Sequence, residues 1–429
     1  MFKIQYTDDK DFMARSKRPA AKTDDIIPIV QDVLEQVKNG GDKAVRDLTL
    51  KFDKSCPENL LVTQDDLEQA EREVPEELKR AIAVAQQNIV KFHKSQLTEN
   101  RVRVETSEGI TCWQQAKAIE KVGIYIPGGS APLFSTVLML GIPAKIAGCS
   151  EIVLCSPPRS GGSINPIVLY CAKILKIDKI FKIGGAQAIA AMAYGTESVP
   201  KVSKIFGPGN RFVTVAKQLV NSSETAIDMP AGPSELAVIA DENTNPVFAA
   251  ADLLSQCEHG TDSQVGLFVT SEKKADEIIA EAERQLQQLP RREIAEQSFR
   301  NSFAVVTGDT LTAVHLTDIW APEHLIISTD DCDELADRVH NAGSVFIGKY
   351  ACESAGDYAS GTNHTLPTNG AAMAYSGLNM DSFMKKITYQ RISENGIRNI
   401  GPAVELMAAA EQLAAHKNAV TVRLDALNA

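Results

Sequence analysis

The 429-residue sequence lacks any C-x-x-C pair, and its eight cysteines are scattered along the chain. This spacing argues against zinc-finger and iron–sulfur sites, because both need clustered thiolates. The start of the chain, MFKIQYTDDK, lacks a basic segment followed by an apolar core, so we expect no signal peptide. Scattered cysteines without a secretion signal predict reduced thiols and a cytoplasmic protein.

Long apolar runs and an excess of positive charge are absent as well. The most apolar stretch, 133–148, is short and is interrupted by Pro143 and Lys145, so we expect no membrane span. The formal net charge of −11 argues against a nucleic-acid partner, because phosphate binding needs clustered Lys and Arg. A length of 429 residues suits two or three domains.

The common nucleotide and hydrolase motifs are missing too. The stretch GSVFIGKY (343–350) is close to a P-loop, but Tyr350 replaces the required Ser or Thr and SVFI has the character of a strand. FGPGNRF (206–212) lacks the third glycine of the dinucleotide fingerprint. Neither HExxH nor GxSxG occurs. Short motifs of this kind therefore identify no activity.

From Lys121 onward, the sequence alternates short apolar runs with helical segments. This alternation predicts parallel sheets covered by helices, in two α/β domains that meet near residue 230. The expected strands are KVGIYIPGG, EIVLCSPP, KIFKIGG and KIFGPG, then ELAVIAD, GLFVTS, SFAVVTG, HLIIST and SVFIGKY. The expected helices of the later half are 246–259, 273–289 and 332–341.

The ends of the chain have a different character. The first part of the chain has helical periodicity, with one helix expected to end at Asn39-Gly40-Gly41. The C-terminal part begins as a basic linker, and Pro402 then opens a helix. This part is too small for its own core, so it must dock on another domain or another subunit. The expected parts are an N-terminal arm at 1–22, a first α/β domain at 23–120 and 231–380, a second at 121–230, and a C-terminal segment at 381–429.

The helix expected at 246–259 ends in the stretch SQCEHG. A helical wheel places Asp252, Gln256 and His259 together, opposite the apolar stripe. This face is either a solvated polar surface or a metal-binding face. Spacing alone does not decide, because metal-binding pairs are normally His–His or His–carboxylate.

Three other groups of polar residues raise the same question. Glu323 and His324 precede a strand, where they could divide proton transfer or be an ordinary loop pair. The polar stretch 352–370 is either a functional loop or a disordered one. It carries three candidate ligands, namely Glu353, Asp357 and His364. Glu411 and His416 are five residues apart, so helix-end electrostatics explains them as well as binding does.

Taken together and in order, the segments resemble the histidinol dehydrogenase family. The matching segments, which run from about residue 20 to the C-terminus, are YIPGG, GGAQAIAAMAYGT, FGPGN, DMPAGPSE, SQCEHG, APEHL, AGDYASGTNH and AAHKNA. The resemblance implies two incomplete Rossmann-like parallel-sheet domains with small helical segments at both ends. It also implies bound NAD, one Zn²⁺ per subunit, and a homodimer in which the C-terminal segment crosses to the partner, so that a monomer is inactive.

The resemblance further implies roles for individual residues. The implied zinc ligands are Gln256, His259, Asp357 and His416. The implied proton-transfer pair is Glu323 and His324. The implied substrate contacts are the four zinc ligands together with Ser234, His324 and Glu411. The implied NAD contacts are Tyr125, Gln187 and Asn210.

The implied reaction is a four-electron oxidation of L-histidinol to L-histidine, the last step of histidine biosynthesis. It passes through enzyme-held L-histidinaldehyde and uses two NAD⁺ in succession. His324 would take the alcohol proton as the first hydride leaves, and Glu323 would then activate water. Two alternatives are a zinc-dependent hydrolase with Glu323 as general base and a two-lobed binding protein without turnover.

Overall fold

The computed structural model describes residues 1–19, 25–97, 102–128, 133–223, 225–229 and 232–429. The chain divides into two compact units. The first unit consists of 1–96 and 119–382, and the second of 97–118 and 383–429. The first unit contains two parallel sheets with covering helices, which confirms the α/β fold class predicted from the sequence.

One sheet of the first unit has six parallel strands in the order β1-β11-β10-β9-β12-β13. These strands are β1 (Phe2–Gln5), β9 (Glu235–Ala240), β10 (Gln264–Val269), β11 (Phe303–Val306), β12 (His324–Ser328) and β13 (Ser344–Ile347). Alternate side chains of β9 point to opposite faces of the sheet and enter two different cores. Leu236 and Val238 belong to one core, and Ala237 and Ile239 belong to the other.

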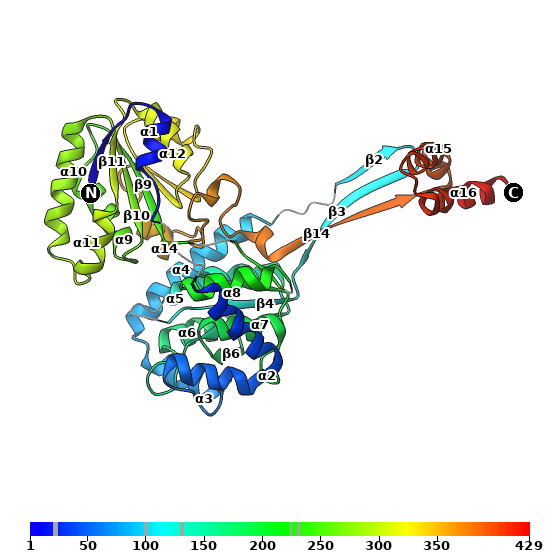
Figure 1. Ribbon diagram of the computed structural model, residues 1–429, viewed down its shortest axis with the longest axis horizontal. Coiled ribbons are helices and arrows are strands. Elements are labelled where there is room, and N and C mark those ends of the chain that lie inside the picture. The colour runs from blue at the N-terminus through cyan, green and yellow to red at the C-terminus, as the bar shows by residue number, and fades with distance from the viewer. Residues whose placement is uncertain (20–24, 98–101, 129–132, 224, 230–231) are drawn as a thin grey trace. The chain divides into compact units, whose positions relative to one another are not determined.

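Helices cover both faces of this sheet (Figure 1). The core that contains Leu236 is covered by α9 (Pro246–Cys257), α10 (Glu272–Leu286) and α11 (Arg292–Arg300). The core that contains Ala237 is covered by α1 (Asp9–Arg15), α12 (Thr310–Trp320) and α13 (Cys332–Ala336). All five strands predicted after residue 230 are present.

The arm expected at 1–22 contains a strand that the sequence did not predict. Strand β1 pairs in parallel with β11, with Phe2 opposite Phe303. A strand of four residues is too short to show a clear periodicity, so its pairing with an open sheet edge determines its structure.

The other sheet of the first unit has five parallel strands in the order β6-β5-β4-β7-β8. The strands are β4 (Lys121–Tyr125), β5 (Glu151–Ser156), β6 (Lys179–Lys182), β7 (Lys204–Phe206) and β8 (Ala226–Ile227). The helices between them are α5 (Phe134–Ala147), α6 (Pro166–Ile174), α7 (Gly185–Tyr194) and α8 (Arg211–Asn221). The carboxyl ends of these strands lie at one edge, where ligands of open α/β sheets bind.

The N-terminal helices pack on this five-stranded sheet, whereas we expected 23–120 to join the later one. The helices are α2 (Ile27–Asp53), α3 (Gln64–Glu73) and α4 (Glu76–Ser95). Helix α2 contacts α7 and α8, α3 contacts α6, and α4 contacts α5. Val30, Val33 and Val37 of α2 share a core with Ile189 of α7. An apolar helix face suits either sheet, so periodicity could not identify the partner. The helix also continues past its expected end, through a kink at Gly41 (φ +54°).

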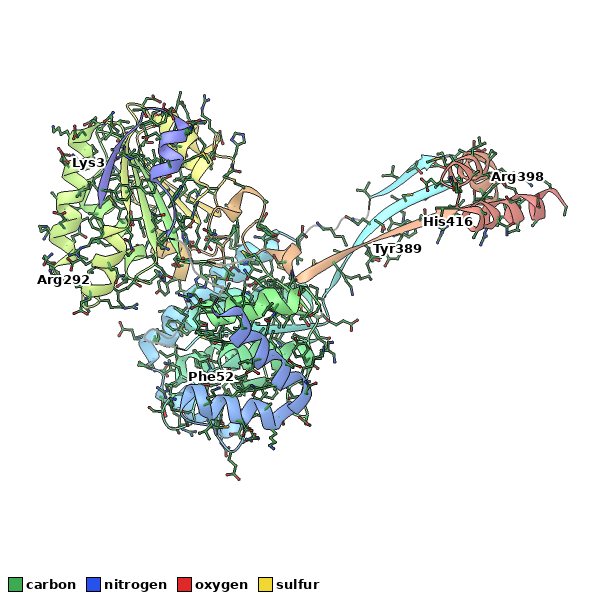
Figure 2. The ribbon with its side chains drawn as sticks, in the orientation of Figure 1. Lys3, Phe52, Arg292, Tyr389, Arg398 and His416 are labelled. Atoms are coloured by element: carbon green, nitrogen blue, oxygen red, sulfur yellow. The ribbon has the colours of Figure 1, made fainter. Side chains whose placement is uncertain are left out.

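The second unit combines an antiparallel sheet with two helices. The sheet has the order β14-β3-β2, and the elements are β2 (Arg103–Ser107), β3 (Ile110–Ala118), β14 (Met384–Ile392), α15 (Glu394–Ala410) and α16 (Ala414–Asn428). The expected linker is thus a strand, and α15 begins well before Pro402, with Ser393 as its cap. Figure 2 shows Tyr389 on this strand and His416 in the helical part of the unit.

The remaining helical segments of the described residues are α14 (Glu353–Tyr358) and two 3₁₀ turns at Ala371–Met373 and Met380–Phe383. Among the described helices, none combines the length and apolar character needed to cross a bilayer.

Candidate active site

Helix α9 carries Gln256 and is followed directly by His259. Asn245 caps the helix by accepting a hydrogen bond from the Val247 amide at 2.9 Å. Gln256 is fully buried, and burial raises the pKa of Asp252 to about 7. The part of this helix face at Gln256 is therefore not solvated, whereas His259, just after the helix, is exposed.

Helix α14 brings two carboxylates to the same place. The stretch 352–370 was expected to be a loop, but its start is helical, so Glu353 and Asp357 lie four residues apart on one helix face. Ligand atoms of His259, Glu353 and Asp357 all lie within 4.8 Å of one another. In the amide orientation that satisfies its neighbours, Gln256 donates to Glu353 and accepts from the Glu235 amide at 2.9 Å.

The start of β12 supplies Glu323 and His324, which are both buried. Glu323 accepts a hydrogen bond at 2.9 Å from the same Glu235 amide, so this N–H is shared between Glu323 and Gln256. His324 Nδ1 donates to the Glu235 carbonyl oxygen at 3.1 Å, and its Nε2 lies 3.5 Å from Asp357 Oδ1. The structure therefore joins the pair from β12 to the cluster on α9 and α14.

Burial and neighbouring charge shift the protonation of this pair. Burial raises the pKa of Glu323 to about 8. Burial also disfavours the charged form of His324, but the carboxylates of Glu323 and Glu353 outweigh it and raise the pKa of His324 to about 10. The His324 side chain in turn helps to lower the pKa of Asp357 against the opposing effect of burial. A carboxyl poised near neutral pH is suited to general acid–base work.

Glu235, at the start of β9, organises the pair from β12 through its main chain. Its buried carboxylate forms an ion pair with Arg18, whose guanidinium also donates to the Trp320 carbonyl oxygen at 2.6 Å. Arg18 and Glu235 escaped the sequence analysis. The effect of Glu235 on the site is carried by backbone atoms, which leave no pattern in the residue types.

His364, whose role was left open, contacts both α14 and α5. Its Nδ1 donates to the Asp357 carbonyl oxygen at 2.9 Å, and its Nε2 is 3.2 Å from the Thr136 hydroxyl of α5. Burial lowers its pKa, which favours the neutral imidazole. These contacts fix the main chain of Asp357 against α5.

The cluster of His259, Glu353 and Asp357 fits a metal ion. An imidazole nitrogen and carboxylate oxygens converge on one point, and this mixture of donors suits zinc. A divalent cation would also offset the charge of carboxylates that burial removes from water. Glu353 was named as a candidate from the sequence, but Asp357 was preferred because small residues flank it.

The remaining residues that the sequence pointed to occupy other positions. Ser234 directly precedes β9 and is partly buried, next to the Glu235 main chain that contacts both Glu323 and His324. Glu411 caps the C-terminal end of α15, and His416 lies in the first turn of α16. Both belong to the second unit and are exposed.

A cavity of about 520 Å³ at the five-stranded sheet is lined by Tyr125, Gln187 and Asn210 together. These residues lie at the end of β4, after β6 and after β7. The Tyr125 hydroxyl accepts from the Gly185 amide at 3.0 Å, and Asn210 caps α8 by accepting from the Val213 amide at 3.1 Å.

The cavity has an unsatisfied polar group on its wall, although the chain lacks the glycine fingerprint of dinucleotide sites. Gln187 is buried, and its Oε1 has no hydrogen-bond partner among the described residues. A Cβ at Gly185 (φ +63°) would lie 2.7 Å from that oxygen. An unsatisfied buried amide oxygen at a cavity wall is an acceptor for a bound ligand.

Comparison with known proteins shows the family of this chain. A family model described as histidinol dehydrogenase matches residues 16–424. The chain is 58% identical over 422 residues to a histidinol dehydrogenase of Bacteroides fragilis, covering 98% of each chain. It is 50% identical over 423 residues to that of Campylobacter jejuni, again covering 98% of each. A crystal structure of histidinol dehydrogenase from Elizabethkingia anophelis matches with a TM-score of 0.97 and 52% identity, covering 100% of this chain and 99% of that one.

Proposed function

The chain belongs to the histidinol dehydrogenase family, and on that premise we propose that it oxidises L-histidinol to L-histidine with two NAD⁺ in succession. The observation that carries the proposal is the single centre in which the buried side chains of Glu323, His324 and Gln256 meet the half-buried Asp357 and the exposed His259. The cavity at Tyr125, Gln187 and Asn210 favours this activity over a metal-dependent hydrolase, which needs no dinucleotide.

The proposed metal is one Zn²⁺ per subunit. In this proposal Gln256, His259 and Asp357 hold it together with the partner subunit's His416. Bound there, zinc supplies a fixed anchor for nitrogen atoms of the substrate and so orients the carbinol carbon. Glu353 accepts hydrogen bonds from the Gln256 amide nitrogen, so the Gln256 oxygen points away from Glu353 and toward the Glu235 amide, and one of its lone pairs is left for the metal.

The proton transfers fall to Glu323 and His324. His324 accepts the alcohol proton as the first hydride leaves for NAD⁺, and a cation on His259 and Asp357 would lower its pKa by opposing the carboxylate charge. Glu323 then takes a proton from water as the water attacks the aldehyde, and the hydrate loses the second hydride. Both side chains are buried, which limits their contact with bulk water.

Substrate contacts from Ser234 and Glu411, and a homodimeric assembly, complete the proposal. The second unit presents large exposed apolar side chains, namely Leu406, Met407, Leu413 and Val422. Such side chains on a small helical unit suit burial against a second copy of the chain. In that dimer each active site takes Glu411 and His416 from the partner, so a monomer is inactive. All eight cysteines are free, which suits a reducing compartment, and we place the reaction in the cytoplasm.

Chelation tests the metal part of the proposal. Removing the metal should abolish NADH formation from L-histidinol and lower the melting temperature, because the buried carboxylates lose their counter-charge. Added Zn²⁺ should restore both, and metal analysis should give one zinc per subunit. Full activity in protein shown by metal analysis to be free of divalent ions would contradict the proposal.

A further inference from the structure

Asp53 is an unusual residue for the place it occupies. It is the last residue of α2, where the helix dipole disfavours a negative charge. Burial raises the pKa of its carboxyl, and no cation of the described residues forms an ion pair with it. Its hydrogen bond from Gln187 Nε2 is long, at 3.5 Å. Within the described residues, the Asp53 carboxylate therefore has only one weak hydrogen bond and no ion pair to offset its burial.

Asp53 lines the cavity of Tyr125, Gln187 and Asn210. Among the described residues of the lining, it is the only carboxylic acid, and Arg159 is the only cation. Much of the remaining wall is apolar, formed by Ile29, Val30, Val33, Phe52, Pro127, Pro157, Pro158 and Phe212. Apolar walls with a single carboxylate suit a flat base attached to a sugar with free hydroxyls.

The position of the cavity indicates which end of the cofactor it receives. None of the described residues that line it belongs to the proton-transfer pair or to the metal cluster. The nicotinamide ring must reach the substrate at that centre. The cavity is therefore left for the adenosine end of the dinucleotide.

We propose that the Asp53 carboxylate accepts hydrogen bonds from the adenosine ribose diol and thereby selects NAD over NADP. The inference rests on the proposed function and goes beyond it by naming the group that discriminates between the two nucleotides. One carboxylate can accept hydrogen bonds from both ribose hydroxyls at once. Acidic residues bind the adenosine ribose in this way in other dinucleotide-binding folds. A 2′-phosphate would replace one donor with negative charge beside a desolvated carboxylate. In this proposal Arg159, on the same cavity wall, pairs with the diphosphate that both nucleotides carry.

Direct binding tests the proposal without turnover. NADH and NADPH are titrated by fluorescence against the zinc-loaded, full-length protein without histidinol, and the melting-temperature shifts with NAD⁺ and NADP⁺ are measured in parallel. Asp53→Asn removes the charge and keeps the shape, and Asp53→Ser is a second variant with a smaller side chain. Asp47→Asn is the matched control, because it makes the same charge change at an exposed position of the same helix.

Either Asp53 variant should bind NADH about 10- to 100-fold more weakly. This is the loss of affinity expected when a hydrogen bond to a charged group is removed. Binding of NADPH should be unchanged or tighter, so the preference for NADH falls by at least that factor, while Asp47→Asn keeps the wild-type preference. An unchanged ratio of the two dissociation constants in both Asp53 variants would overturn the inference and leave the proposed function standing. A folded wild-type protein that binds neither nucleotide would overturn both.

Discussion

Glu323→Gln is expected to stop the reaction after the first hydride transfer. One NADH should form per active site at a near-normal rate, and the second should form about 10²- to 10⁴-fold more slowly, the usual contribution of a general base. Glutamine keeps the shape and can still accept the hydrogen bond that Glu323 takes from the Glu235 amide, but it cannot take a proton from water. Single-turnover absorbance at the NADH band separates the two steps.

Two further variants show whether the effect is specific. His324→Gln should instead slow the first NADH, because His324 takes the alcohol proton. Glu334→Gln, at an exposed position of α13, should behave as the wild type. Zinc content and melting temperature confirm that each variant is folded and loaded. If Glu323→Gln forms both NADH at the wild-type rate, the water-activating role is wrong.

Mixing two inactive variants should restore activity if the active site is shared between subunits. His259→Asn and His416→Asn should each be inactive as homodimers, because each removes a zinc ligand from every site. After subunit exchange, one of the two sites in a hybrid dimer has both histidines intact. Since half of a random mixture is hybrid, activity should recover to about one quarter of wild type.

This recovery discriminates between two arrangements of the site. If His259 and His416 of one chain served the same site, no hybrid would contain an intact site and no activity would return. Different affinity tags on the two variants allow the hybrid to be isolated and its activity measured alone. An inactive hybrid that contains zinc-binding, folded subunits would contradict the shared site.

The sheets and the cofactor residues could be predicted from the sequence for a clear physical reason. Buried parallel strands are continuous apolar runs, so β4 to β7 and β9 to β13 were recognisable. Tyr125, Gln187 and Asn210 follow such strands, and the carboxyl ends of parallel strands meet at one edge.

Other features depended on contacts between distant segments. Periodicity identified the polar face of α9 but not whether Gln256 is solvated, because that depends on α14 and β9 lying against it. Glu353 and Asp357 gain a common face only because α14 forms in a glycine-rich stretch that looked like a loop. Arg18 supports the site through Glu235 from more than two hundred residues away, a relation that no local pattern contains.

The most direct test of the central claim is the number of NADH molecules formed per L-histidinol consumed by the zinc-loaded protein. Two NADH and one L-histidine per L-histidinol, without free aldehyde, is the result expected from the pairing of Glu323 with His324 at one buried centre. One NADH per substrate, with L-histidinaldehyde as the final product, would contradict the second oxidation. No NADH from a folded, zinc-containing dimer would contradict the proposed function as a whole.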